Sequence, residues 1–158
     1  SYVQGDLRLR SRLARAVLAV PAIVGVEFGL GFAAAAAPGS QVHDPIVHDD
    51  ERGYGRESNR AGGIEGGIST GAPVVLRAAM KPISTLREPL GSVEMGTHRR
   101  VESRFERSDV CAVPAVGIVL EAVVALELAD AALDRFGGAT VGDLVAAVGA
   151  YRRRIGER

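Results

Sequence analysis

The sequence predicts an α+β fold, with strands in the first two thirds of the chain and a helical pair at its C-terminal end. Two short apolar runs of strand-forming residues, 23–28 and 74–79, lie before and after a glycine-rich stretch. Two helical patterns then follow one another between 115 and 154. Strands grouped apart from helices are typical of the α+β class.

Composition narrows the class of protein. With 158 residues, 47% of them hydrophobic, the chain is long and apolar enough to bury a core. Its formal net charge of zero gives no bulk attraction to nucleic acid or to a membrane surface. Cys111 is the single cysteine, so no internal disulfide can form, and a reducing, cytoplasmic location is expected.

No targeting or membrane segment is expected. The chain opens without an initiator Met, a basic n-region or an apolar h-region, which predicts no signal peptide and a start inside a longer protein. The uncharged run at 112–120 gives way to Glu121 and Glu127 well before the roughly 20 apolar residues that a membrane span needs.

The first helix is expected after Asp6, a residue type that caps helix N-termini. Arg8, Arg12 and Arg15 are expected on faces away from its apolar stripe. Pro21 should end the helix or lie just beyond it, because proline cannot continue the hydrogen-bond ladder. The apolar positions that recur at helical spacing are Leu9, Leu13, Ala16, Val17 and Val20.

The strand at 23–28 leads into Gly29-Leu30-Gly31-Phe32-Ala33-Ala34, which matches the dinucleotide-binding fingerprint GxGxxG/A in letters. In a nicotinamide-binding fold this turn opens a long crossover helix. Here Pro38 and Gly39 stop the helix after about two turns, too short for a βαβ unit. The match is therefore weak evidence for such a fold.

The segment 41–51 gathers His43 and His48 with four carboxylates, so a metal site for hydrolysis is one interpretation. The spacing matches no known ligand motif, and Pro45 with the glycines after 51 indicates a solvated loop instead. We expect no metal.

The stretch from Asn59 to Leu86 holds two glycine pairs, the strand at 74–79 and a turn at 81–85. Glycines let a backbone approach a ligand closely, and the turn presents one cation with two hydroxyls, which suits a phosphate or a flat cofactor. Lys81 is the only lysine beside eighteen arginines. Either the site needs a compact ammonium, or composition alone accounts for it.

The last part of the chain, from residue 89 on, predicts a short polar segment followed by two helices with clear ends. Sparse apolar residues at 89–104 indicate edge strands or a hairpin. Pro114 suits a first helical turn, and Asp109 is either a cap or an active-site residue. The helix at 115–136 is apolar on most faces, which predicts burial, and Gly137-Gly138 stops it. Thr140 and Asp143 form a capping box for a last helix.

Three long motifs in register are Asn-Arg-Ala-Gly-Gly-Ile-Glu-Gly-Gly at 59–67, Arg-Ala-Ala-Met-Lys-Pro-Ile-Ser-Thr at 77–85 and Arg-Ser-Asp-Val-Cys-Ala-Val-Pro at 107–114. Together with 25–29 and 136–138 they resemble the C-terminal half of chorismate synthases, nearly from end to end. The resemblance implies that 1–158 is the C-terminal half of a single domain with a β-α-β sandwich-type fold, antiparallel strands packing on central helices. The glycine turn after 28 belongs to this family's own pattern.

The resemblance implies a shikimate-pathway lyase that converts 5-enolpyruvylshikimate 3-phosphate to chorismate and phosphate by 1,4-elimination. It implies reduced FMN as cofactor, NADPH only if the protein reduces its own flavin, and a cytoplasmic homotetramer at full length. Asp109 matches the family's catalytic aspartate beside the flavin. The matching FMN contacts are Pro21, Ala22, Gly66, Lys81, Pro82, Ile83, Ser84, Thr85 and Arg107.

Several positions depart from the family pattern. Val24 replaces a usual lysine, Arg10 lies near a replaced aspartate, and Pro21 stands where a polar residue often contacts flavin. The family's acid histidines and phosphate-binding arginines belong to its N-terminal half, and none of the three histidines here occupies their motifs. We therefore expect this chain alone to be inactive. The alternative is a non-catalytic module that binds flavin or phosphate or serves oligomerisation.

Overall fold

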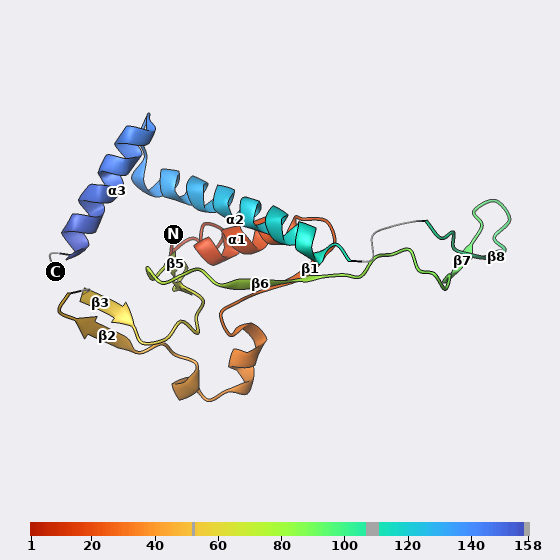
Figure 1. Cartoon of the computed structure of the whole chain (residues 1–158), viewed down its shortest axis with the longest axis horizontal. Helices are drawn as coiled ribbons and strands as arrows, with labels where there is room; N and C mark the ends of the chain where they lie inside the picture. The colour runs from red at the N-terminus through yellow and green to blue at the C-terminus, as the bar shows by residue number, and fades with distance from the viewer. Residues whose placement is uncertain (52, 107–110, 157–158) are drawn as a thin grey trace.

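The computed structural model describes residues 1–51, 53–106 and 111–156. Helices and strands are both well represented, which confirms the α+β prediction (Figure 1). In chain order the elements are α1 Leu9–Leu18, β1 Ile23–Phe28, the 3-10 helices η1 Gly31–Ala36 and η2 Gly39–Gln41, β2 Ile46–Asp49, β3 Gly53–Arg56, β4 Ile64–Glu65, β5 Ile68–Ser69, β6 Leu76–Met80, β7 Gly91–Val93, β8 Arg100–Glu102, α2 Val113–Phe136 and α3 Val141–Gly156.

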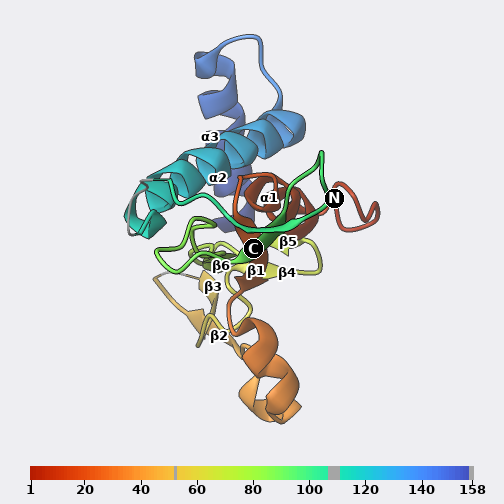
Figure 2. The ribbon, with the colours of Figure 1, turned by 90° about the vertical axis from the view of Figure 1, so that its right-hand side faces the viewer.

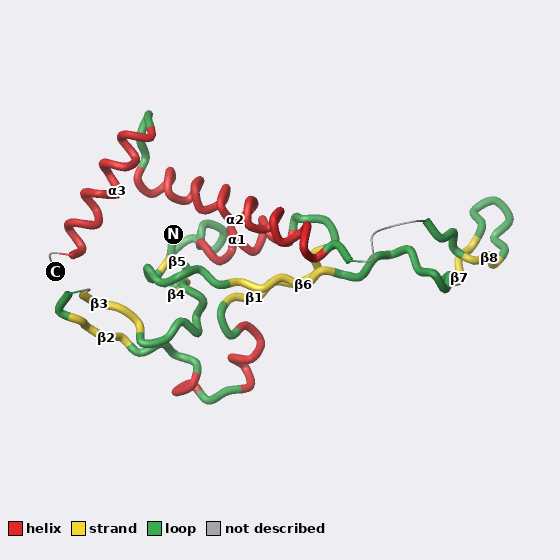
Figure 3. The backbone as a smooth tube through the Cα atoms, in the orientation of Figure 1, coloured by secondary structure: helices red, strands yellow, loops and turns green. Residues whose placement is uncertain are grey.

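The described strands form four antiparallel pairs, β1–β6, β2–β3, β4–β5 and β7–β8 (Figure 3). β1 occupies the predicted range, and β7–β8 is the hairpin expected at 89–104. The strand expected at 74–79 instead spans Leu76–Met80. Val75 lies before it because its amide donates to Gly62 and its carbonyl accepts from Gly29, at 3.1 and 3.0 Å.

Three layers surround the small core. In Figures 1 and 2, α2 lies across α1, and α1 lies over the β1–β6 pair, while α3 turns away from α2. The buried apolar side chains are Leu13 and Val17 of α1, Ile23 of β1 and Ile64 of β4. The predicted apolar stripe of the first helix is therefore confirmed at its two central positions.

The first helix differs from the prediction in two respects. It begins after Arg8, with no side-chain cap, so the expected cap at Asp6 is wrong. The Leu9 amide instead donates to the Gly67 carbonyl at 2.9 Å. Arg12, expected on an outward face, is buried with 6% of its surface exposed.

Arg12 is buried because α2 presents three carboxylates to it. Its guanidinium donates to Glu127 and Asp134, each at 2.6 Å, and to Asp130. These acceptors are spaced at 127, 130 and 134, so they share one face of α2. The hydrogen bond to Glu127, with the other carboxylates, raises the pKa of Arg12 above its ordinary value. Arg12 thus fastens α1 to α2.

The predicted burial of the helix at 115–136 is wrong for the described chain. Pro114 lies in the first turn of α2 and Gly137 caps its end, as expected, yet no residue of α2 is buried. Ile118 and Leu126 are 67% and 72% exposed. An apolar helix is buried only where other elements cover it, and here α1 covers mainly one side.

The chain exposes more surface than a compact monomer of its mass. Its accessible surface is 12070 Å² for 16.5 kDa. A compact monomer of that mass exposes about 7,600 Å². The core that composition led us to expect is therefore present but small, formed by Leu13, Val17, Ile23 and Ile64.

Tight turns at the glycines explain the fingerprint-like run after β1. Gly29 has φ +56°, and a Cβ there would lie 1.9 Å from the Arg60 carbonyl oxygen. Gly31 has φ +54° and lies against the Glu27 side chain, whose carboxylate accepts from the Phe32 amide at 3.0 Å. η1 then ends at Ala36, so these glycines allow close backbone packing and open no crossover helix.

At the C-terminal end, the predicted capping box is confirmed. The Asp143 amide donates to the Thr140 hydroxyl at 3.2 Å, and the Asp143 carboxylate accepts from the Thr140 amide at 2.9 Å. The hydrogen bond from the Thr140 side chain lowers the pKa of Asp143. Within the described residues, no helix is both long and apolar enough to cross a bilayer.

Candidate functional site

Gly66 and Gly67 form the turn of the β4–β5 hairpin, with φ of +57° and +90°. The turn is held on the N-terminal end of α1, because Gly67 accepts from the Leu9 amide and a Cβ on Gly67 would lie 2.6 Å from Arg8. A Cβ on Gly66 would meet nothing within 4 Å. Gly66 therefore exposes its backbone to open space.

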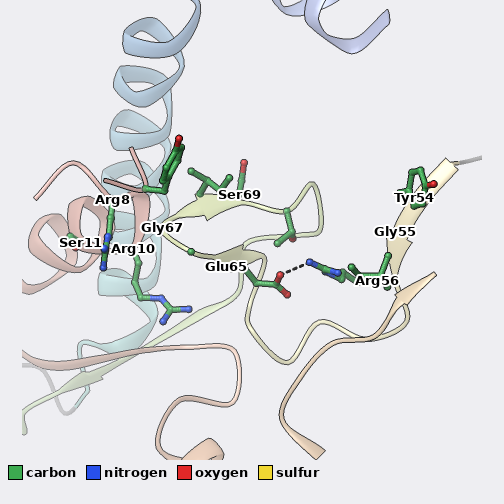
Figure 4. A pocket seen from close by; sticks show the side chains of 14 residues that line it. Arg8, Arg10, Ser11, Tyr54, Gly55, Arg56, Glu65, Gly67 and Ser69 are labelled. Carbon is green, nitrogen blue, oxygen red and sulfur yellow. Dashed lines mark hydrogen bonds and ion pairs between the residues drawn. The ribbon is translucent and has the colours of Figure 1, made fainter. Parts of the chain in front are cut away.

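That open space is a hollow of about 1090 Å³ between the start of α1, the β4–β5 turn and β3 (Figure 4). Three arginines line it, Arg8, Arg10 and Arg56, together with the hydroxyls of Ser69 and Thr70. Glu65 is the acidic residue in its lining. The lining is thus net cationic and rich in donors, which suits an anionic ligand.

Two of these arginines are held in place by protein contacts. Arg56 pairs with Glu65 at 2.5 Å, which joins β3 to β4 (Figure 4). Arg10 donates to the Ile64 carbonyl at 2.9 Å and lies 5.7 Å from the centre of the Phe28 ring. Composition and motifs did not single out Arg8 or Arg56, since the hollow exists only once β3 and β4 meet α1.

Lys81 and Ala22 come together at the other end of α1. The Lys81 amide donates to the Ala22 carbonyl at 2.8 Å, extending the β1–β6 pairing by one step. Ala22 has φ +69°, so the chain turns sharply between α1 and β1. The structure therefore unites two segments that were predicted from separate motifs to contact FMN.

The side chains near the contact between Ala22 and Lys81 differ in exposure. Pro21, Lys81, Pro82 and Ser84 are exposed, whereas Ile83 is half-buried. Thr85 is also half-buried. Within the described chain, Lys81 takes part in no ion pair. Its ammonium is available to an anion.

Gly66 lies apart from Lys81. The Gly67 carbonyl accepts from Leu9, the first residue of α1, whereas Ala22 comes shortly after Leu18, the last, so the ten-residue helix lies between them. Ten helical residues span about 15 Å. One copy of the chain thus places its predicted cofactor residues at two separate ends of α1 (Figure 1). Arg107 and Asp109 lie outside the described residues.

Asp44 anchors the segment that leads into the glycine pairs, a role the sequence did not indicate. Its carboxylate accepts from the Ser58 hydroxyl at 2.5 Å and from the amides of Arg60 and Ala61 at 2.7 and 2.9 Å. Burial alone would raise the pKa of Asp44, but these hydrogen bonds outweigh it and lower the pKa. Asp44 is therefore a structural acceptor.

Of the two histidines in the segment 41–51, His48 lies on β2 of the β2–β3 hairpin and His43 precedes that strand. His48 packs edge-on against Tyr54, with ring centroids 4.8 Å apart, and its Nδ1 lies 3.8 Å from Asp50. Among the residues that the structure describes, no three His, Cys, Asp or Glu side chains are grouped so as to hold a metal ion. The hairpin thus supplies Arg56 to the hollow, whereas neither His43 nor His48 lines it.

Comparison with solved structures shows what fold this arrangement belongs to. A crystal structure of a chorismate synthase superposes with a TM-score of 0.81 and 39% sequence identity, covering 100% of this chain and 40% of that one. The match confirms the predicted fold of antiparallel strands packed on helices.

Curated relatives agree. Chorismate synthases of Geobacter sulfurreducens and Desulforudis audaxviator are 58% and 55% identical over 151 and 155 residues, which are 91% and 98% of this chain. The family model for chorismate synthase matches residues 1–133. The chain therefore belongs to the chorismate synthase family. It spans 38% and 40% of the lengths of those two relatives.

Proposed function

We propose that this chain supplies flavin-contacting residues of a lyase that forms chorismate from 5-enolpyruvylshikimate 3-phosphate by 1,4-elimination of phosphate. Family membership supports this proposal. The observation that carries it to particular residues is the hydrogen bond that joins Ala22 to Lys81, since both belong to segments that match the family's FMN contacts.

The residues present fit the proposed cofactor. Lys81 offers an exposed ammonium for a phosphate or for the polar rim of a ring system, and the exposed Ser84, in the same turn of the sequence, offers a hydroxyl. Gly66 offers an open backbone at the far end of α1. When bound, reduced FMN would lend electron density to the substrate as the phosphate leaves and take it back as the proton is lost.

The chain's own side chains have separate tasks in this proposal. Lys81 binds and orients an anion. Arg107 contacts the anionic substrate or the cofactor, and the Asp109 carboxylate holds and passes on the proton removed in the elimination. NADPH is needed only if the protein reduces its own flavin. The active assembly is proposed to be a cytoplasmic homotetramer of the full-length protein.

A second role is favoured by the exposed surface. The chain exposes 12070 Å², against about 7,600 Å² for a compact monomer of its mass. Part of this surface is apolar, including Ile118 and Leu126 of α2, and exposed apolar surface favours packing against further protein. A module for assembly, without elimination chemistry of its own, is therefore the alternative. Under either role the isolated chain is proposed to be inactive.

Flavin fluorescence titration of the full-length protein tests the proposal. We expect Lys81→Ala to weaken FMN binding at least about tenfold, because a charge-assisted hydrogen bond contributes about 1.5–3 kcal/mol. Arg87→Ala is the matched control, an exposed cation six residues along the same loop. Asp109→Asn should keep binding and lose turnover. Absence of FMN binding by the full-length protein, or equal effects of Lys81→Ala and Arg87→Ala, would contradict the proposal.

A further inference from the structure

The β7–β8 hairpin extends away from the layers formed by α2, α1 and the β1–β6 pair (Figures 1 and 3). Every residue of both strands is exposed. Among the described strands, each of the two pairs only with the other, so each has an unpaired outer edge. A two-stranded hairpin is marginally stable alone in water, and an unpaired edge is a template for another strand.

Hydrogen bonds at the two ends of the hairpin define its pairing pattern. The Glu94 amide donates to the Arg99 carbonyl at 3.0 Å, next to the turn. The Ser103 amide donates to the Leu90 carbonyl at 2.9 Å, at the open end. Glu94 with Arg99, and Leu90 with Ser103, are therefore hydrogen-bonded pairs of one antiparallel register. The two pairs are separated by four positions along each strand.

This pattern fixes the directions in which the backbone groups of β8 point. Hydrogen-bonded and non-hydrogen-bonded pairs alternate in an antiparallel ladder, so Val101 turns its backbone groups toward Ser92 of β7. Arg100 and Glu102, on either side of Val101, turn theirs toward the outer edge. That edge therefore presents the amide and carbonyl of two residues spaced to pair with another antiparallel strand.

The sequence of this edge is complementary to itself. When two copies of β8 run antiparallel with Val101 opposite Val101, Arg100 of each copy faces Glu102 of the other. Opposite charges directly across an antiparallel pair are favourable. Each of the two Arg100–Glu102 pairs also exchanges two backbone hydrogen bonds, which makes four between the two copies. Within the described chain, neither Arg100 nor Glu102 has an ion-pair partner.

We propose that β8 pairs with β8 of a second copy of this chain about a twofold axis at Val101. The product is a four-stranded antiparallel sheet, β7–β8–β8–β7, shared between two copies. Such an isologous contact uses one surface twice, as closed dimers require. The inference stands on the hairpin alone and does not depend on the lyase activity.

Disulfide trapping tests the register. In a Cys111→Ser background, which removes the exposed native thiol, Val101→Cys places two thiols across the axis. Opposed residues of a non-hydrogen-bonded pair lie about 4.5 Å apart at Cα, within disulfide range. Ser92→Cys is the control, since the two β7 strands would be three strand spacings, about 14 Å, apart. We expect a crosslinked dimer with Val101→Cys alone.

Charge exchange tests the same contact in solution by sedimentation. Arg100→Glu sets Glu opposite Glu102 twice, and we expect dimer affinity to fall at least about tenfold. Arg100→Glu with Glu102→Arg restores the pairs and should return the affinity to within about threefold of the starting value. Failure of Val101→Cys to crosslink, equal crosslinking of Ser92→Cys, or an unchanged affinity in Arg100→Glu would each overturn the proposal.

Discussion

Replacing Arg12 with Met should destabilise the protein by about 2–4 kcal/mol. Met keeps most of the apolar stem of Arg12 but removes the charge that three α2 carboxylates share. Most of the loss arises at Glu127, whose side chain is 14% exposed and would remain charged without its partner. Removing such a charge-assisted hydrogen bond costs about 1.5–3 kcal/mol.

The other two carboxylates contribute less. Asp130 and Asp134 are 68% and 64% exposed, so water replaces the guanidinium and each loss is about 0.5 kcal/mol or less. Arg15→Met is the control, because Arg15 is 72% exposed and lies 3.8 Å from Glu127. Its expected cost is below about 0.5 kcal/mol.

Urea unfolding followed by circular dichroism measures these differences. We expect Arg12→Met with Glu127→Met to be more stable than the sum of the two single changes predicts, by about 1 kcal/mol or more, because the pair is then removed without leaving a buried charge. Additive costs, or an Arg12→Met protein no less stable than Arg15→Met, would refute the assignment of Arg12 as the link between α1 and α2.

Three further predictions use the same unfolding assay. Gly29→Ala should lower the free energy of unfolding by more than about 2 kcal/mol, since φ of Gly29 is +56° and a Cβ there would lie 1.9 Å from the Arg60 carbonyl oxygen. A loss below about 1 kcal/mol would show that the turn relaxes. Gly149→Ala should raise the free energy of unfolding by about 0.5–1 kcal/mol, because Gly149 lies within α3 and alanine favours a helix. A Cβ there would meet only the end of Arg153, at 3.6 Å, so a loss of stability would argue against this packing. Asp44→Asn should be less stable than wild type at pH 7 and 5. Because folding lowers the pKa of Asp44, its contribution is complete above the unfolded pKa near 3.9 and is lost as pH falls through the folded pKa, so the difference should narrow at pH 3; an unchanged difference would contradict the role of the Asp44 carboxylate.

Most local signals in the sequence predicted local structure, although the helix cap expected at Asp6 was wrong. β1, the capping box at Thr140 and the first-turn proline of α2 all depend on residues within a few positions of one another. Helical spacing likewise located Leu13 and Val17 in the core. Such features follow from backbone and side-chain preferences that need no distant partner.

Features that depend on distant partners escaped prediction. Arg12 is buried because its acceptors lie 115 to 122 positions away, and periodicity assigns any arginine to the surface. Asp44 has partners 14 to 17 positions away, so its acidic neighbours suggested a solvated or metal-binding loop.

The candidate site shows the same division. The family resemblance selected Ala22, Gly66 and Lys81. Only the structure shows that Ala22 meets Lys81 next to the β1–β6 pairing, and that the turn with Gly66 lies at the other end of α1, where Gly67 accepts from Leu9. The arginines of the hollow were missed because two elements far apart in the sequence supply them, with Arg8 and Arg10 at the start of α1 and Arg56 on β3. The apolar pattern of α2 could not reveal that the described chain leaves much of it uncovered.

Chorismate formation from 5-enolpyruvylshikimate 3-phosphate with reduced FMN tests the central proposal most directly. The measurement compares the full-length protein, its Lys81→Ala variant and the isolated 158-residue chain. We predict turnover by the full-length protein, strongly reduced turnover with Lys81→Ala at limiting FMN, and none by the isolated chain. Turnover by the isolated chain, or no turnover by a folded full-length protein that binds FMN, would contradict the account.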